Sequence, residues 1–455
     1  MFVLTLLLAF FVLTLNVATP WHTLHEENGL VFESAAINHI RYGLAFTKGQ
    51  DYFDESTRLY TYSAGTIHPT GVSSDQQFQY LLTGQSRPVL YGHHPPLLGL
   101  TVAGSLLVFG YHFWSVRLVP ITFTMLGLIL FYSLMWLLFD PVTASLSAVL
   151  FISFPITAYY GRNVAHESPT LCCALGVALC YVLWRRSQRT RWLVAMAACM
   201  ALGMAYGWPM LFCALILPAL DWLAIRRVHW GLVAATVGAG TLIFLVVIAQ
   251  ISWASGWSLN ALEDAFLLRS ATVTPREAYA VSIPWPITIL VRNAIDFGLW
   301  TLLLLPALWR FFVARVRTEG FSMRLQFIAL FGLVGLTHIL VFHVGAAVHD
   351  YWQFYLIPYY AASLGWGGSV LATTLAQRSS HATHRLSRRV RLQLSHRPHL
   401  LWKILPEARE EVYRGVWAAV FGVAVLIAGI PVTHQLYAGG SILQFPSGGP
   451  IVPLL

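Results

Sequence analysis

Long apolar runs separated by short polar segments make up most of the chain. Eleven of these runs are about 16 to 24 residues long, close to the length that an α-helix needs to cross a bilayer. They cover residues 2–19, 118–139, 142–160, 168–184, 191–206, 208–225, 229–252, 291–312, 323–343, 352–374 and 413–433. A shorter apolar piece covers residues 97–110. The pattern predicts an all-α polytopic membrane protein with about 11 to 12 transmembrane helices.

The composition agrees with membrane embedding. Of the 455 residues, 57% are hydrophobic and 10% are charged, whereas about 25% of the residues in a soluble domain are charged. The formal net charge is +9, but the basic residues fall in short segments between apolar runs rather than on one soluble module. We therefore expect no nucleic-acid binding. The five cysteines lie inside or at the ends of apolar runs, which predicts free thiols.

Four connections between the runs are rich in arginine: residues 185–191, 226–227, 310–324 and 378–414. The positive-inside rule predicts that all four face the cytoplasm. Counting single crossings from these anchors places three other segments outside the membrane. They are residues 162–167, residues 253–285 and residues 349–352.

The first loop (21–95) holds seven acidic and four basic residues, so we expect it to lie outside too. If both this loop and residues 162–167 are external, an even number of crossings must separate them, yet three apolar pieces lie between. We therefore expect that residues 97–110 do not span the membrane. They would lie in the interface or re-enter, as Pro95-Pro96 permits.

The chain is expected to form one integrated membrane unit. Residues 1–374 would be the transmembrane catalytic domain, including the external loop 20–95. Residues 375–412 would be a basic cytoplasmic segment that contacts anionic lipid. Residues 413–455 would hold the last transmembrane helix and an external tail. The first apolar run has no Lys or Arg before it, which favours a retained helix over a cleaved signal peptide.

The first external loop contains two candidate groups for chemistry. Glu26 and Glu27 follow the first apolar run, and residues 32–40 after them predict a short amphipathic helix. A carboxylate at the membrane rim is suited to act as a general base, although a solvated loop start explains the same pattern. Further on, His93 and His94 precede the rigid Pro-Pro pair and have imidazoles able to bind a phosphate. A turn with incidental histidines is the alternative.

Two more external helix ends carry ionisable residues. Arg162, His166 and Glu167 join two predicted spans, and ionisable groups at membrane depth are costly and tend to be functional. A structural ion pair between Arg162 and Glu167 is the other interpretation. His349-Asp350-Tyr351 lies at the end of a later span. Placement of aromatic side chains at the membrane interface explains the tyrosine but leaves the histidine and the aspartate unexplained.

Three arginines lie at the predicted outer face: Arg117, Arg269 and Arg276. Each is able to face an anionic head group, and interfacial snorkelling is the alternative explanation.

Metal and nucleotide chemistry receive little support from the sequence. Six residues have side chains that suit zinc: Glu26, Glu27, His93, His94, His349 and Asp350. None of them has the local spacing of a metal motif, so we predict no metal and no other cofactor. The sequence also lacks a Walker A pattern and a dinucleotide-binding pattern, which argues against an ATP-driven transporter and a nucleotide-sugar enzyme.

Taken in order, several of these motifs resemble the GT-C glycosyltransferases. The shared features are an acidic start to the first external loop, Pro95-Pro96-Leu97, Arg117-Leu118-Val119-Pro120, Ser153-Phe154-Pro155, Gly161-Arg162 with Glu167, and a late His349-Asp350-Tyr351. The resemblance covers roughly residues 1–370. It is strongest to the family-39 group, which includes protein O-mannosyltransferases and the aminoarabinose transferases of lipid A.

The resemblance implies roles for particular residues. In that family an acidic residue of the first external loop lies near the acceptor or the reacting carbon. Here Glu26 and Glu27 occupy this region, as Glu-Glu where the family has Asp-Glu. A basic residue before Pro-Pro-Leu binds the lipid phosphate in the family. That residue is usually lysine, and here it is His94, which carries a full charge only below a pKa of about 6.5.

The implied function is transfer of a sugar from a polyprenyl-phosphate donor to a hydroxyl of a lipid, glycan or protein on the non-cytoplasmic face of the cell membrane. We predict inversion in a single displacement, with Glu27 as the favoured base and Glu26 as its rival. The donor phosphate or sugar would be bound by His94, His93, Arg162, His349, Asp350, Tyr351, Arg117 and Arg269. Glu167 and His166 would contact the acceptor or form a structural pair.

Two other functions remain open. A transporter or flippase for a lipid-linked or anionic solute would explain the many helices, but it predicts ionisable residues near the midplane and two pseudo-symmetric halves. A structural membrane subunit leaves the gathering of histidines and carboxylates on one side unexplained.

Overall fold

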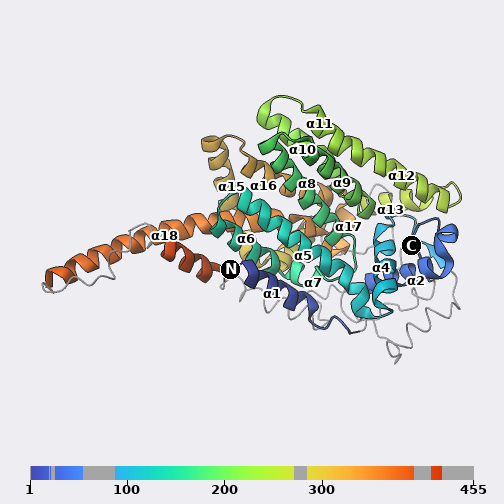
Figure 1. Ribbon diagram of the computed structural model, residues 1–455, viewed down its shortest axis with the longest axis horizontal. Helices are drawn as coiled ribbons and strands as arrows, with labels where there is room; N and C mark the ends of the chain where they lie inside the picture. The colour runs from blue at the N-terminus through green and yellow to red at the C-terminus, as the bar shows by residue number, and fades with distance from the viewer. Residues whose placement is uncertain are drawn as a thin grey trace.

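The computed structural model describes residues 2–19, 21, 26–54, 88–270, 284–393 and 411–422. The predicted candidate Arg276 lies outside these residues. The described part is a bundle of helices along one long axis, with one two-stranded sheet (Figure 1).

The helices follow the apolar runs closely. In chain order they are α1 (Phe2–Thr14), α2 (Glu27–Thr47), α4 (Leu97–Phe109), α5 (Phe113–Leu138), α6 (Pro141–Ser153), α7 (Pro155–Tyr160), α8 (Glu167–Ser187), α9 (Thr190–Tyr206), α10 (Met210–Ile225), α11 (Trp230–Val233), η2 (Ala234–Gly238), α12 (Ala239–Ala254), α13 (Asn260–Ser270), α14 (Trp285–Phe297), α15 (Leu299–Glu319), α16 (Met323–Val341), α17 (His343–Val348), η3 (Asp350–Leu356) and α18 (Ile357–Gln393). Residues 411–422 form a further helix. The strands β1 (Tyr52–Asp54) and β2 (Pro88–Leu90) pair antiparallel.

Four of the described helical stretches are long and apolar enough to cross a membrane. They are α5, α8, the continuous run from α11 to α12, and α16. Five shorter apolar helices, α1, α4, α6, α9 and α10, accompany them. The side chains of α8 are mostly buried inside the bundle, whereas the run from α11 to α12 is mostly exposed. Its exposed face is apolar, as expected for a helix that contacts lipid.

Two predicted spans are interrupted. The run 142–160 is divided between α6 and α7, because Phe154 is extended (ψ 131°) before Pro155 and a residue before proline avoids the helical region. The run 291–312 is divided between α14 and α15 at Gly298, which has a φ of +89°. The predicted short helix 32–40 is also longer than expected, since α2 runs from Glu27 to Thr47.

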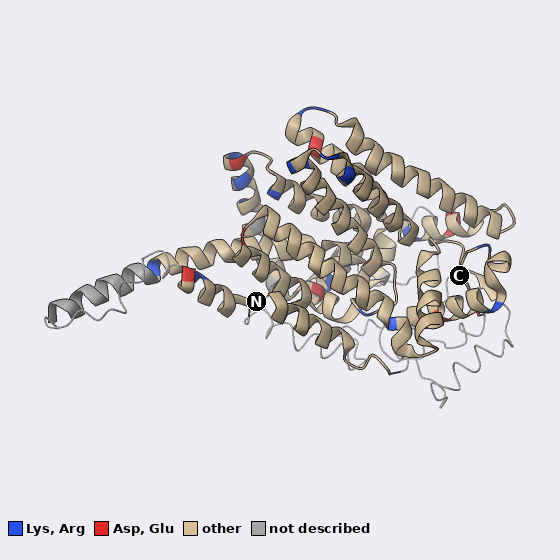
Figure 2. Ribbon diagram, viewed as in Figure 1, with Lys and Arg blue, Asp and Glu red and all other residues tan. Residues whose placement is uncertain are grey.

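One end of the bundle, which we call the basic end, gathers the arginine-rich connections. There Arg324 donates from Nε to the carbonyl of Leu138 at 2.6 Å, so α16 begins where α5 ends. Arg414 of the helix 411–422 lies 2.8 Å from Asp140, the residue before α6. Figure 2 shows further Lys and Arg residues, in blue, in the connections from α8 to α9 and from α10 to α11.

The opposite end, which we call the site end, joins the other set of connections. The ring of His166, before α8, lies 2.6 Å from the carbonyl of Tyr206 at the end of α9. Trp208 then donates to the carbonyl of His93 at 2.9 Å. Lys48, after α2, donates to the carbonyl of Trp253 near the end of α12 at 2.7 Å. The segments that the sequence placed outside the membrane therefore meet at one end.

Helix α4 does not run the length of the bundle. In Figure 1 it lies across the long axis, beside α2 and α5. It begins after His94, and α5 places Arg117 within hydrogen-bond distance of Glu26. The starts of α4 and α5 are therefore both at the site end, which is consistent with the prediction that residues 97–110 are not a full span.

Candidate active site

A buried ionic cluster joins the start of α2 to α5 and α7. Glu26 is 1% exposed, and its Oε1 lies 3.0 Å from Arg117 Nη2 and 3.6 Å from Arg162 Nη2. Arg117 also donates to the carbonyls of Val17 at 2.9 Å and Thr19 at 2.5 Å. A buried carboxylate between two arginines is stabilised as the anion. Through Arg117, these contacts hold the chain after α1 and the start of α2 against α5.

Arg117 is fully buried, so interfacial snorkelling, the alternative explanation for this residue, is wrong. Its guanidinium lies 4.1 Å from the centre of the Trp21 ring, a cation–π distance. The Trp21 indole donates to Glu33 Oε2 at 2.5 Å. Burial raises the pKa of Glu33 to about 8, although the Trp21 hydrogen bond and the nearby Arg117 oppose this.

Glu33 was missed in the sequence, yet a signal was present. Glu26 and Glu33 are seven residues apart, a spacing of two helical turns that places both on one face of a helix. Together with Glu27, the first residue of α2, they make three acidic residues within two turns. The backbone of Glu27 is described, but its side chain is not.

A tight turn between β2 and α4 presents His93 and His94. Gln50 donates from Nε2 to the carbonyl of His94 at 2.9 Å and to that of Tyr91 at 3.2 Å. The backbone N–H of Tyr91 donates to the carbonyl of Asp51 at 2.8 Å. These bonds use the backbone groups of the turn and leave the imidazole rings for other contacts.

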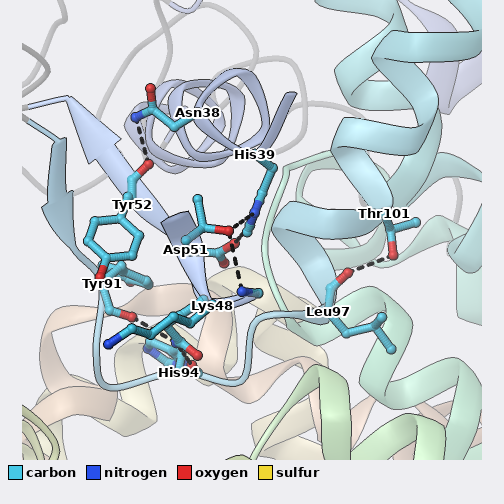
Figure 3. A network of polar contacts seen from close by, with 12 residues as sticks. Asn38, His39, Lys48, Asp51, Tyr52, Tyr91, His94, Leu97 and Thr101 are labelled. Carbon is cyan, nitrogen blue, oxygen red and sulfur yellow. Dashed lines mark hydrogen bonds and ion pairs between the residues drawn. The ribbon is translucent and has the colours of Figure 1, made fainter. Parts of the chain in front are cut away.

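The Asp51 carboxylate joins α2 to the start of α4 (Figure 3). It lies 2.9 Å from His39 Nε2, while His39 Nδ1 lies 3.2 Å from Thr47 Oγ1. Burial raises the pKa of Asp51, and the contacts with His39 and with the backbone of Gly99 oppose that rise. A Cβ at Gly99 would lie 2.0 Å from Asp51 Oδ1. Glycine is therefore needed for the carboxylate to approach the first turn of α4.

Three aromatic rings form a continuous stack at the site end, and a fourth lies tilted beside it. The rings of Tyr91 and His94 are 5.4 Å apart, and those of His94 and His166 are 4.5 Å apart and nearly parallel. His93 lies 4.3 Å from Tyr91 and 4.7 Å from His94. A carbonyl can only accept, so Nδ1 of His166 carries the hydrogen that it donates to Tyr206.

The guanidinium of Arg269 and the imidazole of His349 lie close to the stack. Burial, followed by repulsion from Arg269, His166 and His349, lowers the pKa of His93 well below its usual value. For His94 burial is again the main cause, and the same neighbours add to it. Burial also lowers the pKa of His166 to about 4. All three imidazoles are therefore neutral at pH 7. We call His93, His94, His166, His349 and Arg269 the histidine cluster.

A polar chain connects the histidine cluster to the start of α2. His349 Nδ1 lies 3.3 Å from the Tyr351 hydroxyl, and Asn28 donates from Nδ2 to that hydroxyl at 3.2 Å. Asn28 directly follows Glu27 in the chain. The candidate base thus belongs to the segment that contacts His349 through Tyr351. The side chain of Asp350 is not described.

Glu167 begins α8 directly after His166 and is 8% exposed. Its charge acts on Tyr91, whose pKa is raised to about 12 mainly by burial. The structure therefore places Glu167 beside the stack, and Arg162 beside Glu26. Within the described ranges, no three His, Cys, Asp or Glu side chains are arranged to hold a metal ion.

The predicted residues thus fall into two neighbouring groups. Glu26, Arg117 and Arg162 form a closed ionic cluster, and the predicted histidines gather with Arg269 and Tyr351. The sequence identified these residues one by one in five separate segments. It missed the supporting residues Gln50, Asp51 and His39, which carry no motif of their own.

Comparison with known proteins supports the resemblance found in the sequence. Residues 93–253 match the family model described as dolichyl-phosphate-mannose-protein mannosyltransferase. The matched residues make up less than half of the chain. This range includes His93, His94, Arg162 and His166. No curated protein matches the sequence.

The structure is similar to solved GT-C enzymes. ArnT from Cupriavidus metallidurans bound to undecaprenyl phosphate superposes with a TM-score of 0.56 at 14% identity, over 96% of this chain and 75% of that one. The Archaeoglobus fulgidus oligosaccharyltransferase in the apo form gives 0.55 at 13% identity, over 96% of this chain. The present chain spans 56% of the oligosaccharyltransferase. The prediction of an all-α membrane fold of the GT-C type is confirmed.

Proposed function

We propose that this protein transfers a sugar from a polyprenyl-phosphate donor to a hydroxyl group of a lipid, glycan or protein acceptor at the site end. The observation that carries the proposal is the histidine cluster beside the start of α2. Imidazoles and a guanidinium there are suited to an anionic phosphate, and the acidic segment Glu26–Glu27 lies on the other side of Tyr351. Donor recognition and a base for the acceptor would thus share one site.

Lipid-linked donors agree with this arrangement. In the proposed topology the arginine-rich basic end faces the cytoplasm and the site end faces outside. Nucleotide sugars are made inside the cell, so a site on the outer face requires a sugar that is carried across the membrane on a lipid. The similar ArnT structure has undecaprenyl phosphate bound, which supports the same class of lipid here.

The proposed chemistry is a single displacement. The acceptor oxygen bonds to the anomeric carbon while the bond from that carbon to the phosphate oxygen breaks. The acceptor proton passes to a carboxylate, and the electron pair leaves on the polyprenyl phosphate. A phosphate monoester has a second pKa of about 6, so it departs without a strong general acid. Attack opposite the leaving group inverts the anomeric configuration.

Glu27 is the proposed base. Glu26 is held between Arg117 and Arg162, and these contacts fix its carboxylate beside two guanidiniums. Glu27 is one residue closer to Asn28 and its contact with Tyr351. Glu26 then acts as a structural residue that fixes the start of α2.

Transfer of radiolabelled sugar from a panel of polyprenyl-phosphate sugars, by purified protein with host lipid extract, tests this proposal. Glu27→Gln should lower kcat by about 10²- to 10⁴-fold, the usual contribution of a general base, and leave the unfolding temperature unchanged. Glu26→Gln is the matched control and should lower the unfolding temperature, because Arg117 and Arg162 lose their carboxylate. Binding of the donor without transfer would instead favour a flippase or transporter.

A further inference from the structure

The histidine cluster joins one guanidinium to four imidazoles, and Arg269 is its permanently charged member. Arg269 donates from Nη1 only to the carbonyl of Ala265 in its own helix, at 3.2 Å. Its Nε is buried without a hydrogen-bond partner among the described residues. No ion pair joins a carboxylate to Arg269, His93 or His94 in the part of the chain that the structure describes.

The paired imidazoles of His93 and His94 are only partly covered by the described residues. The contacts of these residues with Trp208 and Gln50 use backbone carbonyls, and the ring of His94 lies between those of Tyr91 and His166. No ring nitrogen of either residue has a hydrogen-bond partner among the described residues.

We propose that the histidine cluster binds the lipid phosphate together with a proton, which the imidazole pair of His93 and His94 takes up as the phosphate enters. This inference rests on the proposed function and deepens it. The family resemblance has a lysine at the position of His94, which would be charged before the ligand arrives. In this protein the matching charge would form only when the anion is present.

The groups around the pair explain why binding and protonation are linked. Facing it are Arg269 from α13, His166 from the start of α8, and His349 from the end of α17. Tyr91 lies within the same stack, and the charges of Asp51 and Glu167 reach that tyrosine. With the site empty, burial and the positive charge of Arg269 keep both imidazoles neutral. A phosphate reverses the sign of the local field and stabilises an imidazolium.

The proton that the imidazole pair takes up comes from the solution. Above about pH 7 a phosphate monoester is mostly a dianion, since its second pKa is about 6. The proton that forms the new N–H bond then comes from the buffer, whose conjugate base remains in solution. Because the free imidazole is neutral and the bound one is charged, affinity should fall about tenfold for each unit of rising pH until the bound imidazole itself loses its proton.

Calorimetric titration of the full-length protein in detergent with undecaprenyl phosphate tests this inference. The titration is run at about pH 8, well above the second phosphate pKa of about 6, in two buffers that differ in ionisation enthalpy. The difference in observed heat gives the number of protons bound with each phosphate. The expected value is close to one. Binding with no proton uptake would overturn the inference and leave the proposed function intact.

The His94→Lys variant is the matched control. Lysine supplies a permanent charge, so the variant should bind undecaprenyl phosphate with almost no proton uptake and with an affinity that no longer falls as the pH rises from about 7 to 8.5, since the lysine pKa is about 10.4. Proton uptake equal to that of the wild type would show that His94 is not involved, and His93→Gln then tests the other ring. Absence of binding by the wild type at every pH would instead refute the phosphate site and, with it, the proposed function.

Discussion

Two clusters at opposite ends of the bundle contain the same types of side chain but differ in whether a carboxylate balances their positive charge. At the basic end, the buried carboxylate of Asp221 lies 2.7 Å from the Tyr181 hydroxyl and 2.6 Å from His229 Nδ1, and it also pairs with Arg185. At the site end, tyrosine, histidine and arginine gather again as Tyr91, the stacked imidazoles and Arg269. There no carboxylate ion-pairs with the arginine among the described residues.

The difference indicates which cluster is structural. Asp221 is 1% exposed, and its partners come from α8 and from the segment before α11. Its charge is therefore balanced within the chain, and the cluster fixes helices against one another. The histidine cluster is partly exposed and has an excess of potential positive charge, so its balancing anion is expected to be a ligand.

The largest effect is expected from removing the anion of the closed cluster. Asp221→Asn leaves Arg185 and His229 without a charged partner, and breaking a buried ion pair costs about 3–5 kcal/mol. The unfolding temperature in detergent should fall strongly. Asp140→Asn is the control, because the Asp140–Arg414 pair is partly exposed and such pairs contribute about 0–1 kcal/mol. Equal effects of the two variants would contradict the structural role of Asp221.

Glu33 extends the comparison to a buried carboxylate whose neighbours do not offset the effect of burial on its pKa. Its pKa is about 8 in the folded protein and 4.5 as a free group. Between these values the unfolded chain releases the proton while the folded protein keeps it, so stability falls as the pH rises from 4.5 to 8.

Glu33→Gln should remove this loss. The variant should gain up to a few kcal/mol over the wild type by about pH 8, because each pKa unit corresponds to about 1.4 kcal/mol, and it should match the wild type near pH 4.5. Thermal unfolding of both proteins across this range measures the difference. Parallel curves would show that Glu33 is ionised in the folded protein.

The sequence predicted the helices better than their interruptions. Apolar runs such as 118–139 and 323–343 became α5 and α16, because membrane spans depend on length and hydropathy, which are local properties. The break at Pro155 had a local signal in the proline itself. Residues 32–40 contain no local signal for the extra length of α2, because that length depends on packing against α4.

The candidate site was predicted as residues but not as contacts. Glu26 and Arg117 are 91 positions apart, and no local pattern reports a pair at that separation. Both were candidates for chemistry, whereas the structure joins them in a closed ionic cluster. Gln50 acts through its amide on backbone carbonyls, so its role depends entirely on where the chain folds back. The catalytic and binding roles of the site residues stay predictions.

The smallest effect is expected at the open cluster, and there it should concern the ligand rather than the fold. Arg269→Gln removes a guanidinium that no described carboxylate balances, so the unfolding temperature should hardly change. Loss of one charged hydrogen bond to the phosphate costs about 1.5–3 kcal/mol, and the KM for the polyprenyl-phosphate donor should rise about 10- to 100-fold, since 1.4 kcal/mol is a factor of ten. Arg186→Gln at the basic end removes a mainly exposed arginine and should leave this KM unchanged. A fall in the unfolding temperature with Arg269→Gln, at constant KM, would mean that the open cluster is closed by a part of the chain itself, and that the two ends of the molecule are alike after all.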